Sequence, residues 1–554
     1  MGFLTGTVAS VRFYSKRHWP ILLALGIFAG TTAILWYSCL EKNGGQFVYT
    51  LDDPYIHMAI AKNVVRHGVW GVTPYHFSSS SSSPLWTLSL VLFYGLFGVH
   101  EITSFILNLI FAGLALGLVY VLLRERLPGW VVFLAILAMI FFPPLVPLVF
   151  SGMEHTAHLF LTLLTIALAA KTLSEKAPSP AMQRGLLVSA FLVTAARYEG
   201  LFLILVLSVL FACRRRWLFA LALAGAGVLP LAAYGVWSAA NGWYFLPNPV
   251  ILKGTNGNQV VLDFLKDLFV RGHPLTWQVI KRLAPALVVS RINAHPHILF
   301  LVIPSLLVLV YRRGSFWNPA NVTNAAFIGT VFLHMQFAST GWFYRYEAYG
   351  VAFGIYAVAA GLADCLPWRD GWGGWGDRLF RAGALLLLAI LVGSPLRVRA
   401  VKSLKDTPVA SHNIFEQQYQ MAFFLRQFYQ GQVVAANDIG AIDYLVDFDL
   451  VDLAGLGTRE SAAFKLKQAY GAYQIAAVAD QYGTQIALVY DSWFQIPSSW
   501  IKVGEWQITD NVVCGDSTVS FYAVDPAAAP GLIDALQAFA SRLPGDVIQE
   551  GIYR

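Results

Sequence analysis

Long apolar segments recur through the first 400 residues of this chain and constrain its fold more than any other feature. Each is long enough, or nearly long enough, to cross a bilayer as a helix. Only 12% of the residues are charged, whereas a soluble globular protein has roughly 25%. The sequence therefore predicts a mainly α-helical polytopic membrane protein with about eleven transmembrane helices. The predicted spans are residues 20–40, 102–123, 130–150, 154–173, 185–199, 200–213, 217–239, 296–311, 321–341, 345–363 and 379–396.

A twelfth apolar segment, residues 84–98, is too short to span comfortably. We expect it to form an interfacial helix in the first exterior loop. When it is excluded, the basic clusters of the chain all fall on the side of the N-terminus, which the positive-inside rule assigns to the cytoplasm. We therefore expect a cytoplasmic N-terminus and an exterior C-terminus. The clusters are Arg124 with Arg126, Lys171 with Lys176 and Arg184, Arg214–Arg216, and Arg312 with Arg313.

The character of the chain changes near residue 400. Residues 433–456 alternate strand-like and helix-like segments, 486–493 and 517–525 are typical of strands, and 531–543 are typical of a helix. The predicted organisation is a transmembrane domain, residues 1–400, followed by a soluble exterior α/β domain, residues 401–554. The composition breaks at a linker, residues 402–413.

Ionisable residues gather in the loops of one predicted face, the exterior one. Because such groups are costly at membrane level, each needs a partner, water or a ligand. Their convergence from five loops predicts one outward-facing polar cavity. The residues are Asp52 and Asp53 in the first loop, Glu154 in the second, Arg197 and Glu199 at a tip, Asn248 and Lys253 in the large loop 240–295, and Arg345 and Glu347 at the next tip.

Ordinary roles remain open for several of these residues. Asp53 precedes Pro54 and suits the N-cap of a helix, which leaves Asp52 without a structural role apart from loop solvation. The serine run 78–83 is typical of a flexible linker. The other ordinary roles are capping for Glu154, an ion pair for Arg197 with Glu199, and snorkelling for Lys253 and Arg345. His155 and His158 share a helical turn, but no third metal ligand is in view.

Several motifs occur in an order typical of one family. They are "LDDPYIHMAIAKNVVRHG", "SPLWTLSLV", "SGMEHT", "ARYEG", "FLPNPVILKG", "YRYEAY" and "NDIGAIDYLVDFDLVDLAGL". This set resembles the polyprenyl-phosphate-sugar-dependent glycosyltransferases of the GT-C superfamily, in particular bacterial relatives of the mycobacterial terminal arabinofuranosyltransferases. Tyr198 stands where that family has the proline of an Arg-Pro-Glu tip, and Pro249 where a threonine is common. These departures leave the sugar open.

The resemblance implies an inverting hexosyl- or pentosyltransferase in a bacterial inner (plasma) membrane. It would move a sugar from a polyprenyl-phosphate donor to an envelope glycan, lipid or protein acceptor on the exterior face, without a nucleotide cofactor or a nucleic-acid partner. A base must accept the proton of the attacking hydroxyl, and we assign Asp52 to this role with Asp53 orienting. The cations Arg345, Lys253 and Arg197 would face the leaving phosphate.

Other contacts to the donor or acceptor are implied for a further set of residues. Trp86, with its aromatic neighbours on the interfacial helix, would line a groove for the prenyl chain. Because some members of the superfamily need a metal and others do not, Asp52, Asp53 and Glu154 are also candidate ligands of a divalent cation, Mg²⁺ or Mn²⁺. The remaining contacts are Glu154, Glu199, Asn248, Tyr346, His57 and Ser82.

Two other classes of function compete with glycosyl transfer. A transporter or flippase for lipid-linked or small polar substrates would typically show repeated halves and charges near the bilayer midplane. Here the charges lie at the ends of the spans on one face, and no repeat is evident, which favours a one-sided enzyme. A non-catalytic scaffold is the second alternative, and the intact Asp52–Asp53 pair argues against it.

Overall fold

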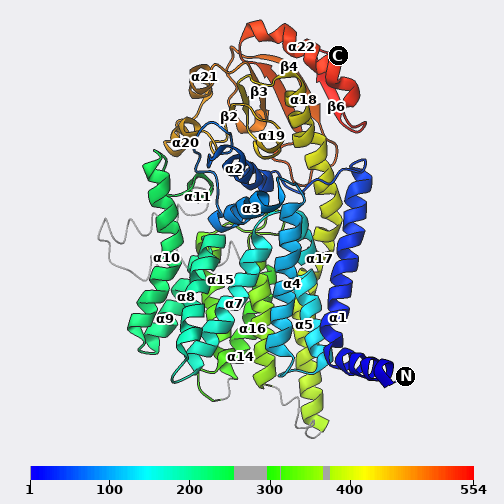
Figure 1. The fold of residues 1–554 in the computed structure, drawn as a ribbon, viewed down its shortest axis with the longest axis vertical. Coiled ribbons are helices and arrows are strands. Elements are labelled where there is room, and N and C mark those ends of the chain that lie inside the picture. Colours follow the sequence, from blue (N-terminus) through cyan, green and yellow to red (C-terminus); the bar gives the residue numbers. More distant parts are fainter. Residues whose placement is uncertain (1, 255–295, 312–313, 366–374) are drawn as a thin grey trace.

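The computed structural model of this chain has two parts, a bundle of long helices and a smaller unit built on one sheet (Figure 1). The structure describes the backbone of residues 2–254, 296–311, 314–365 and 375–554. Side chains are described for the same residues except 2–17, 253–254 and 376–394. The predicted fold class, a helical membrane part followed by a C-terminal α/β unit, is confirmed.

Each predicted apolar segment coincides with helix in the structure. By length and composition, five helices of the described chain can cross a membrane: His18–Lys42 of α1 (Gly2–Lys42), α4 (Thr103–Leu123), α7 (His155–Ser174), α10 (Trp217–Ala240) and α16 (Ala348–Cys365). The remaining segments fall on α5 (Gly129–Phe141), α8 (Pro180–Ala196), α9 (Gly200–Cys213), α14 (Pro296–Val310), α15 (Pro319–Phe337) and α17 (Trp375–Ile414).

One predicted span, residues 130–150, is broken in two. α5 ends at Phe141, and the short helix α6 (Leu145–Phe150) begins after Pro143 and Pro144. Proline lacks a backbone N–H and disfavours helical geometry in the residue before it, so two prolines in succession end a helix. α6 is buried throughout and leads the chain directly into residues 151–154.

The C-terminal unit is a mixed six-stranded sheet with the order β2-β1-β3-β5-β4-β6. The first three strands in that order are parallel, and the others pair antiparallel. Two segments predicted as strands contain β3 and β5, and the predicted closing helix contains most of α22 (Ala529–Phe539). The strands are β1 (Val434–Ala436), β2 (Leu450–Asp452), β3 (Ile486–Val489), β4 (Ile501–Gln507), β5 (Thr518–Ala523) and β6 (Ile548–Gly551).

The predicted linker, residues 402–413, is helical. It forms the last part of α17, which continues through the π-helix η1 (Phe415–Tyr419) into α18 (Gln420–Phe428). Figure 1 shows this helical run extending from the far end of the bundle into the sheet unit. The connection between the two parts is therefore a stiff rod.

Two helices of the first predicted exterior loop, α2 (Asp53–His67) and α3 (Pro84–Phe97), lie between the bundle and the sheet unit (Figure 1). α2 packs against α19 (Gly440–Leu445) of the sheet unit. Lys62 on α2 is 2% exposed. Its ammonium donates to the carbonyls of Asp443 and Tyr444, each at 2.9 Å, and pairs with Asp447 at 2.6 Å.

Lys62→Met should weaken the attachment of the sheet unit. Methionine keeps the length of the side chain but leaves two carbonyls without their donor, and an unsatisfied buried polar group costs about 1–3 kcal/mol. Asp447 is 48% exposed, so its carboxylate can turn to water. We expect a lower temperature of thermal unfolding for the purified protein. Lys467→Met, at an exposed position, is the matched control, and equal unfolding temperatures for the two variants would contradict this role.

Candidate active site

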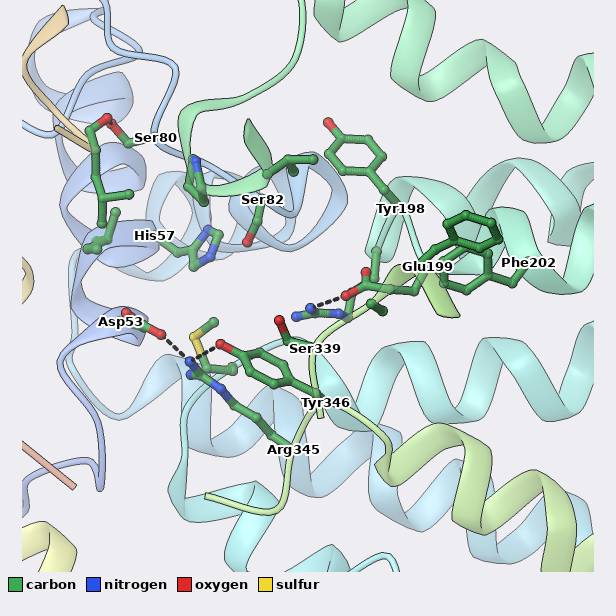
Figure 2. Close-up of a pocket in the computed structure, with 18 residues that line it drawn as sticks. Asp53, His57, Ser80, Ser82, Tyr198, Glu199, Phe202, Ser339, Arg345 and Tyr346 are labelled. Atoms are coloured by element: carbon green, nitrogen blue, oxygen red, sulfur yellow. Dashed lines mark hydrogen bonds and ion pairs between the residues drawn. The ribbon is translucent and has the colours of Figure 1, made fainter. Parts of the chain in front are cut away.

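A cavity of about 240 Å³ lies where the bundle, the α2–α3 loop and the sheet unit meet. Figure 2 shows Asp53, His57 and Ser82 on one side of it, facing Arg345, Tyr346 and Glu199 on the other. Charged and aromatic side chains from three separate connections of the chain, those between α1 and α4, α8 and α9, and α15 and α16, therefore converge. The remaining lining residues are Ile56, Ser80, Met153, Arg197, Tyr198, Phe202, Pro249, Val250, Phe337, Ala338, Ser339 and Leu456.

The loop between α15 and α16 carries Arg345 into this cavity by an unusual backbone path. Gly341 and the three residues after it, Trp342, Phe343 and Tyr344, all have positive φ, between 37° and 82°. Bulky residues rarely adopt this conformation, and where they do the surrounding structure must hold them. Here Arg399 donates to the Tyr344 carbonyl and pairs with the Glu347 carboxylate, which in turn accepts from the Gly341 amide at 2.8 Å.

Arg345 is the central cation of the cavity and is 1% exposed. Its Nη2 donates to the Asp53 carboxylate and to the Tyr346 hydroxyl, the latter at 3.3 Å. Its Nε and Nη1 have no hydrogen-bond partner among the described residues. The ring of Tyr346 lies 5.0 Å from this guanidinium and 5.8 Å from that of Arg197. A buried guanidinium with unused donors is suited to a ligand oxyanion.

Arg197 forms a second buried charge cluster with two carboxylates. It pairs with Glu154, and its Nη2 lies 2.6 Å from Glu199 Oε1. The other oxygen of Glu154, Oε2, has no hydrogen-bond partner in the described part of the chain and lies 3.9 Å from His57 Nε2. Glu154 occupies the N-cap of α7, but its side chain caps nothing. The ion pair expected for Arg197 and Glu199 is present, and it belongs to the cavity lining.

Burial keeps His57 neutral. It lines the cavity, and its Nδ1 lies 2.9 Å from Thr87 Oγ1. Desolvation lowers the pKa of His57, against the smaller opposing effect of Glu154. His57 is thus a neutral hydrogen-bonding group at physiological pH.

The serine run 78–83 is an ordered wall of the site. All its members but Ser82 are buried, and Ser82 lines the cavity. Ser83 Oγ donates to the Ala196 carbonyl at 2.6 Å, and Ser80 Oγ donates to the Leu456 carbonyl at 2.7 Å. Short hydroxyl side chains satisfy backbone groups at close quarters, and here they join the bundle to the sheet unit. The flexible-linker interpretation is wrong.

The two adjacent aspartates point in different directions. Asp53 is the first residue of α2 and faces the cavity, whereas Asp52 does not line it. Asp52 accepts hydrogen bonds from the backbone amides of Gly440, at 2.7 Å, and Ala441, at 2.8 Å. It occupies the N-cap position of α2 but makes no side-chain capping bond. Capping therefore accounts for neither aspartate, and Asp52 instead ties α2 to the sheet unit.

Two other predicted contacts, Asn248 and Trp86, are not among the residues that line the cavity. Asn248 is buried, and its Nδ2 donates to the Gly455 carbonyl at 2.8 Å. Trp86 is 1% exposed and packs near Phe111 within the bundle. The backbone of Lys253 belongs to α11 (Asn248–Gly254), and its side chain lies outside the described residues.

The expected metal ligands do not fit a cation in this structure. Both oxygens of Asp52 are occupied by backbone amides, Asp53 pairs with Arg345, and Glu154 pairs with Arg197. Among the described residues, ligand atoms of three His, Cys, Asp or Glu side chains converge only at His412, Glu416 and Asp546. No step below passes through a metal.

Several residues of the site were not predicted from the sequence. Tyr198, Phe202 and Ser339 line the cavity. Arg399 holds the Arg345 loop from α17. The sequence marks Arg399 only by its position, with Arg397, just beyond the last apolar segment. An arginine at such a position is ordinarily assigned to the membrane interface.

The C-terminal unit matches the model of a domain of unknown function (DUF8728) over residues 412–522. No curated protein matches the sequence of the chain. The expected glycosyltransferase family is therefore not shown by sequence comparison alone.

Several solved structures are similar to the chain over most of its length. ArnT from Cupriavidus metallidurans bound to undecaprenyl phosphate is 14% identical, with 91% of this chain and 98% of that chain covered and a TM-score of 0.49. The archaeal oligosaccharyltransferase AglB from Archaeoglobus fulgidus, in complex with an inhibitory peptide and a dolichol-phosphate, is 12% identical, with 86% and 70% covered and a TM-score of 0.48.

A second structure of the Archaeoglobus fulgidus oligosaccharyltransferase, a complex with Zn and sulfate, is 11% identical, with 94% and 74% covered and a TM-score of 0.45.

Asp52 should make stability depend on pH. Burial, followed by the charge of Asp438, raises the pKa of Asp52 to about 8, against the lowering effect of its two amide bonds. Because an unfolded aspartate titrates at roughly 3.9, the folded state holds this proton more tightly. The contribution to stability is complete at low pH and is lost as pH rises toward and through about 8.

We therefore expect the unfolding temperature to fall between pH 6 and pH 9. The free energy of unfolding should decrease by at most about 1.4 kcal/mol per pH unit for one proton. Asp438→Asn removes the neighbouring charge while keeping an acceptor for Tyr490 and Gln418, and should flatten this dependence. The exposed Asp480→Asn is the control. A slope in Asp438→Asn equal to that in the control would contradict the coupling.

Proposed function

We propose that the chain is an inverting glycosyltransferase that moves a sugar from a polyprenyl-phosphate donor to a hydroxyl-bearing acceptor. The observation that carries the proposal is Arg345, a buried guanidinium that lines a cavity together with a carboxylate and has two nitrogens without a hydrogen-bond partner among the described residues. This combination suits a reaction in which a phosphate leaves and a hydroxyl loses its proton. The order of sequence motifs supports the same class.

Arg345 is the proposed phosphate-binding group. As the bond from the anomeric carbon to the phosphate oxygen breaks, the phosphate takes the electron pair and gains charge. Nε and Nη1 of Arg345 have no hydrogen-bond partner among the described residues, and each forms one planar fork with Nη2. A phosphate that uses either fork therefore takes Nη2 from Asp53. The left-handed loop, held by Arg399, fixes the guanidinium before the donor arrives, so that little reorganisation is needed.

Asp53 is the proposed base, in place of Asp52. Its carboxylate lies in the cavity and is 27% exposed, so an acceptor hydroxyl can reach it. A donor phosphate on Arg345 would compete for the guanidinium and release Asp53 to accept the proton as the acceptor oxygen bonds to the anomeric carbon. Asp52 has its two oxygens occupied by amides, which leaves it a structural role.

The second charge cluster is the proposed site for the sugar hydroxyls. Glu154 Oε2 and the Tyr198 hydroxyl have no hydrogen-bond partner in the described part of the chain. Together with Glu199, Ser82 and neutral His57, they offer acceptors and donors around the cavity. A pocket with a few fixed polar groups among apolar ones is the usual way to orient a small ligand.

The prenyl chain has a plausible apolar exit at the other end of the cavity. Phe202 on α9 and Phe337 on α15 line it, with ring centroids 6.4 Å apart, and Phe337 is 44% exposed. Trp86, expected in this groove, is buried in the bundle. We therefore propose that the lipid leaves the cavity between α9 and α15.

We further propose that the sheet unit and the cavity face the exterior of a bacterial inner (plasma) membrane. The α7–α8 and α9–α10 connections meet at the end of the bundle away from the sheet unit (Figure 1), where Arg216 donates to the carbonyls of Thr172 and Glu175. Basic clusters at that end support a cytoplasmic location for it. The acceptor, a glycan, lipid or protein, and the pentose or hexose are left to experiment.

The function is tested by incubating the purified chain in lipid nanodiscs with a panel of polyprenyl-phosphate sugars and candidate acceptors. Mass spectrometry should detect free polyprenyl phosphate together with a glycosylated acceptor. Movement of a substrate across sealed vesicles with no glycosidic product would instead support the transporter class and overturn the proposal.

The adjacent aspartates provide a matched pair of variants. Asp53→Asn should lower the rate of transfer about 10²- to 10⁴-fold, the usual contribution of a general base, while the donor still binds. Asp52→Asn should lower the unfolding temperature and keep most of the activity. Transfer rates would be measured at saturating donor, with donor Kd determined separately. Full activity in Asp53→Asn, or loss of activity only in Asp52→Asn, would return the base role to Asp52.

Arg345→Lys keeps the positive charge but loses the fork. We expect a loss of about 10²- to 10³-fold in the rate, the range found when one transition-state donor is removed. Lys465→Arg, within the sheet unit, serves as a control for handling and folding. An unchanged rate in Arg345→Lys would show that the phosphate is bound elsewhere.

A further inference from the structure

Three ligand-type side chains converge away from the cavity, where α17 meets the end of the chain. They are His412 in the last turn of α17, Glu416 in η1 and Asp546 in the loop before β6. One ligand atom from each lies within 4.8 Å of the others. The residues therefore come from two distant parts of the sequence and meet at one point.

The hydrogen-bond network sets the orientation of the His412 ring. Ser411 Oγ donates to the Val48 carbonyl at 2.7 Å and therefore accepts from Asn43 Nδ2, 2.9 Å away. The other end of the Asn43 amide, Oδ1, then faces His412 Nδ1 at 3.1 Å, so Nδ1 must donate. Nε2 is left to face Asp546 Oδ2 at 2.8 Å and Glu416 Oε1 at 3.4 Å.

An imidazole nitrogen facing two carboxylates needs a cation between them or a proton of its own. A ring held through its other nitrogen by an amide or carboxyl oxygen is the usual arrangement of a metal-ligating histidine. Asn43 is 1% exposed, so this support is built into the end of α1. The orientation of His412 is thus suited to metal binding through Nε2.

Glu416 supplies the second, independent observation. It is 2% exposed, and its Oε1, aimed at His412, has no hydrogen-bond partner among the described residues. The carboxyl group of Glu416 has other polar neighbours. It forms side-chain hydrogen bonds with Asn413 and Asp546, and the charge of Lys42 acts on it at longer range. A buried carboxylate oxygen without a donor is costly, and a bound cation would remove that cost.

We propose that His412, Glu416 and Asp546 bind a divalent transition-metal ion of the Zn²⁺ type. One imidazole nitrogen and two carboxylate oxygens form a mixed set that suits Zn²⁺, with water as a fourth ligand. Tetrahedral ligands at about 2.0–2.2 Å from a metal lie roughly 3.3–3.6 Å apart. The 3.4 Å spacing of His412 and Glu416 already matches, and the 2.8 Å spacing of His412 and Asp546 needs to widen by about 0.5–0.8 Å.

The site would act as a structural clamp. It joins α17 and η1 to the last loop of the sheet unit, and through Asn43 it reaches the end of α1. Asp546 is 48% exposed, which gives the ion an entry path from solvent. Because none of the three lines the cavity, the ion would fix the sheet unit on the bundle and take no part in the reaction.

The test is a titration of the purified, chelator-treated full chain with Zn²⁺ alone, in which binding is measured by isothermal titration calorimetry. We expect one equivalent to bind, and the unfolding temperature to rise with Zn²⁺ concentration. Asp546→Asn and His412→Ala should each raise Kd at least about 10-fold, the lower range seen even for changes to groups that support metal ligands. The exposed Asp480→Asn and His67→Ala should leave Kd unchanged.

Asp546→Asn separates an effect on metal binding from an effect on folding, because the residue is half exposed and its replacement need not unfold the protein. Replacing Zn²⁺ with Co²⁺ gives a second readout, since a tetrahedral Co²⁺ site has characteristic visible absorption. If no equivalent binds, or if Asp546→Asn and the control have the same Kd, the cluster is an imidazolium ion pair and the proposal is overturned.

Discussion

Burial of charge at one end of an apolar bundle is the constraint on which the architecture depends. An ionisable group in such a place is tolerated only with a partner. Arg345 pairs with Asp53 at the start of α2, and Arg197 pairs with Glu154 at the start of α7 as well as with Glu199 in its own loop. Because the first two pairs join different parts of the chain, they hold the loops in place against one another.

The same constraint explains the attachment of the sheet unit. Asp52, directly before α2, and Lys62 on α2 find their partners in the backbone of residues 440–444. The serine run adds short hydroxyl contacts at the same junction, and Leu456 of the sheet unit closes one side of the cavity. The C-terminal unit is therefore part of the wall of the site, and the cavity is incomplete without it.

The sequence predicts the helical bundle, the α/β unit and the convergence of charged loops, because apolar length and the side of each loop are local properties. It does not decide between Asp52 and Asp53. Which one faces the cavity depends on the amides of Gly440 and Ala441, 388 and 389 positions away. Local N-cap rules favour a structural role for Asp53. The hydrogen bonds from the distant amides give the structural role to Asp52 instead.

Other misses have similar physical causes. A serine run has no pattern that distinguishes an ordered wall from a linker, because its role lies in partners such as the Ala196 carbonyl. Arg399 lies beyond the last apolar segment. Its role depends on the left-handed turn before Arg345, which it holds by donating to the Tyr344 carbonyl. Consecutive prolines at 143 and 144 carried a local signal for the broken span, which the apolar length of residues 130–150 concealed.

The central claim is that Arg345 receives the phosphate of a lipid-linked sugar in the cavity beside Asp53. A structure of the full chain in nanodiscs with a bound polyprenyl phosphate tests this most directly. We expect phosphate oxygens within hydrogen-bond distance of Arg345 Nη2 and of Nε or Nη1, with Asp53 displaced from Nη2 and the prenyl chain passing between α9 and α15. A lipid phosphate bound elsewhere, with Arg345 still engaged only by Asp53 and Tyr346, would contradict it.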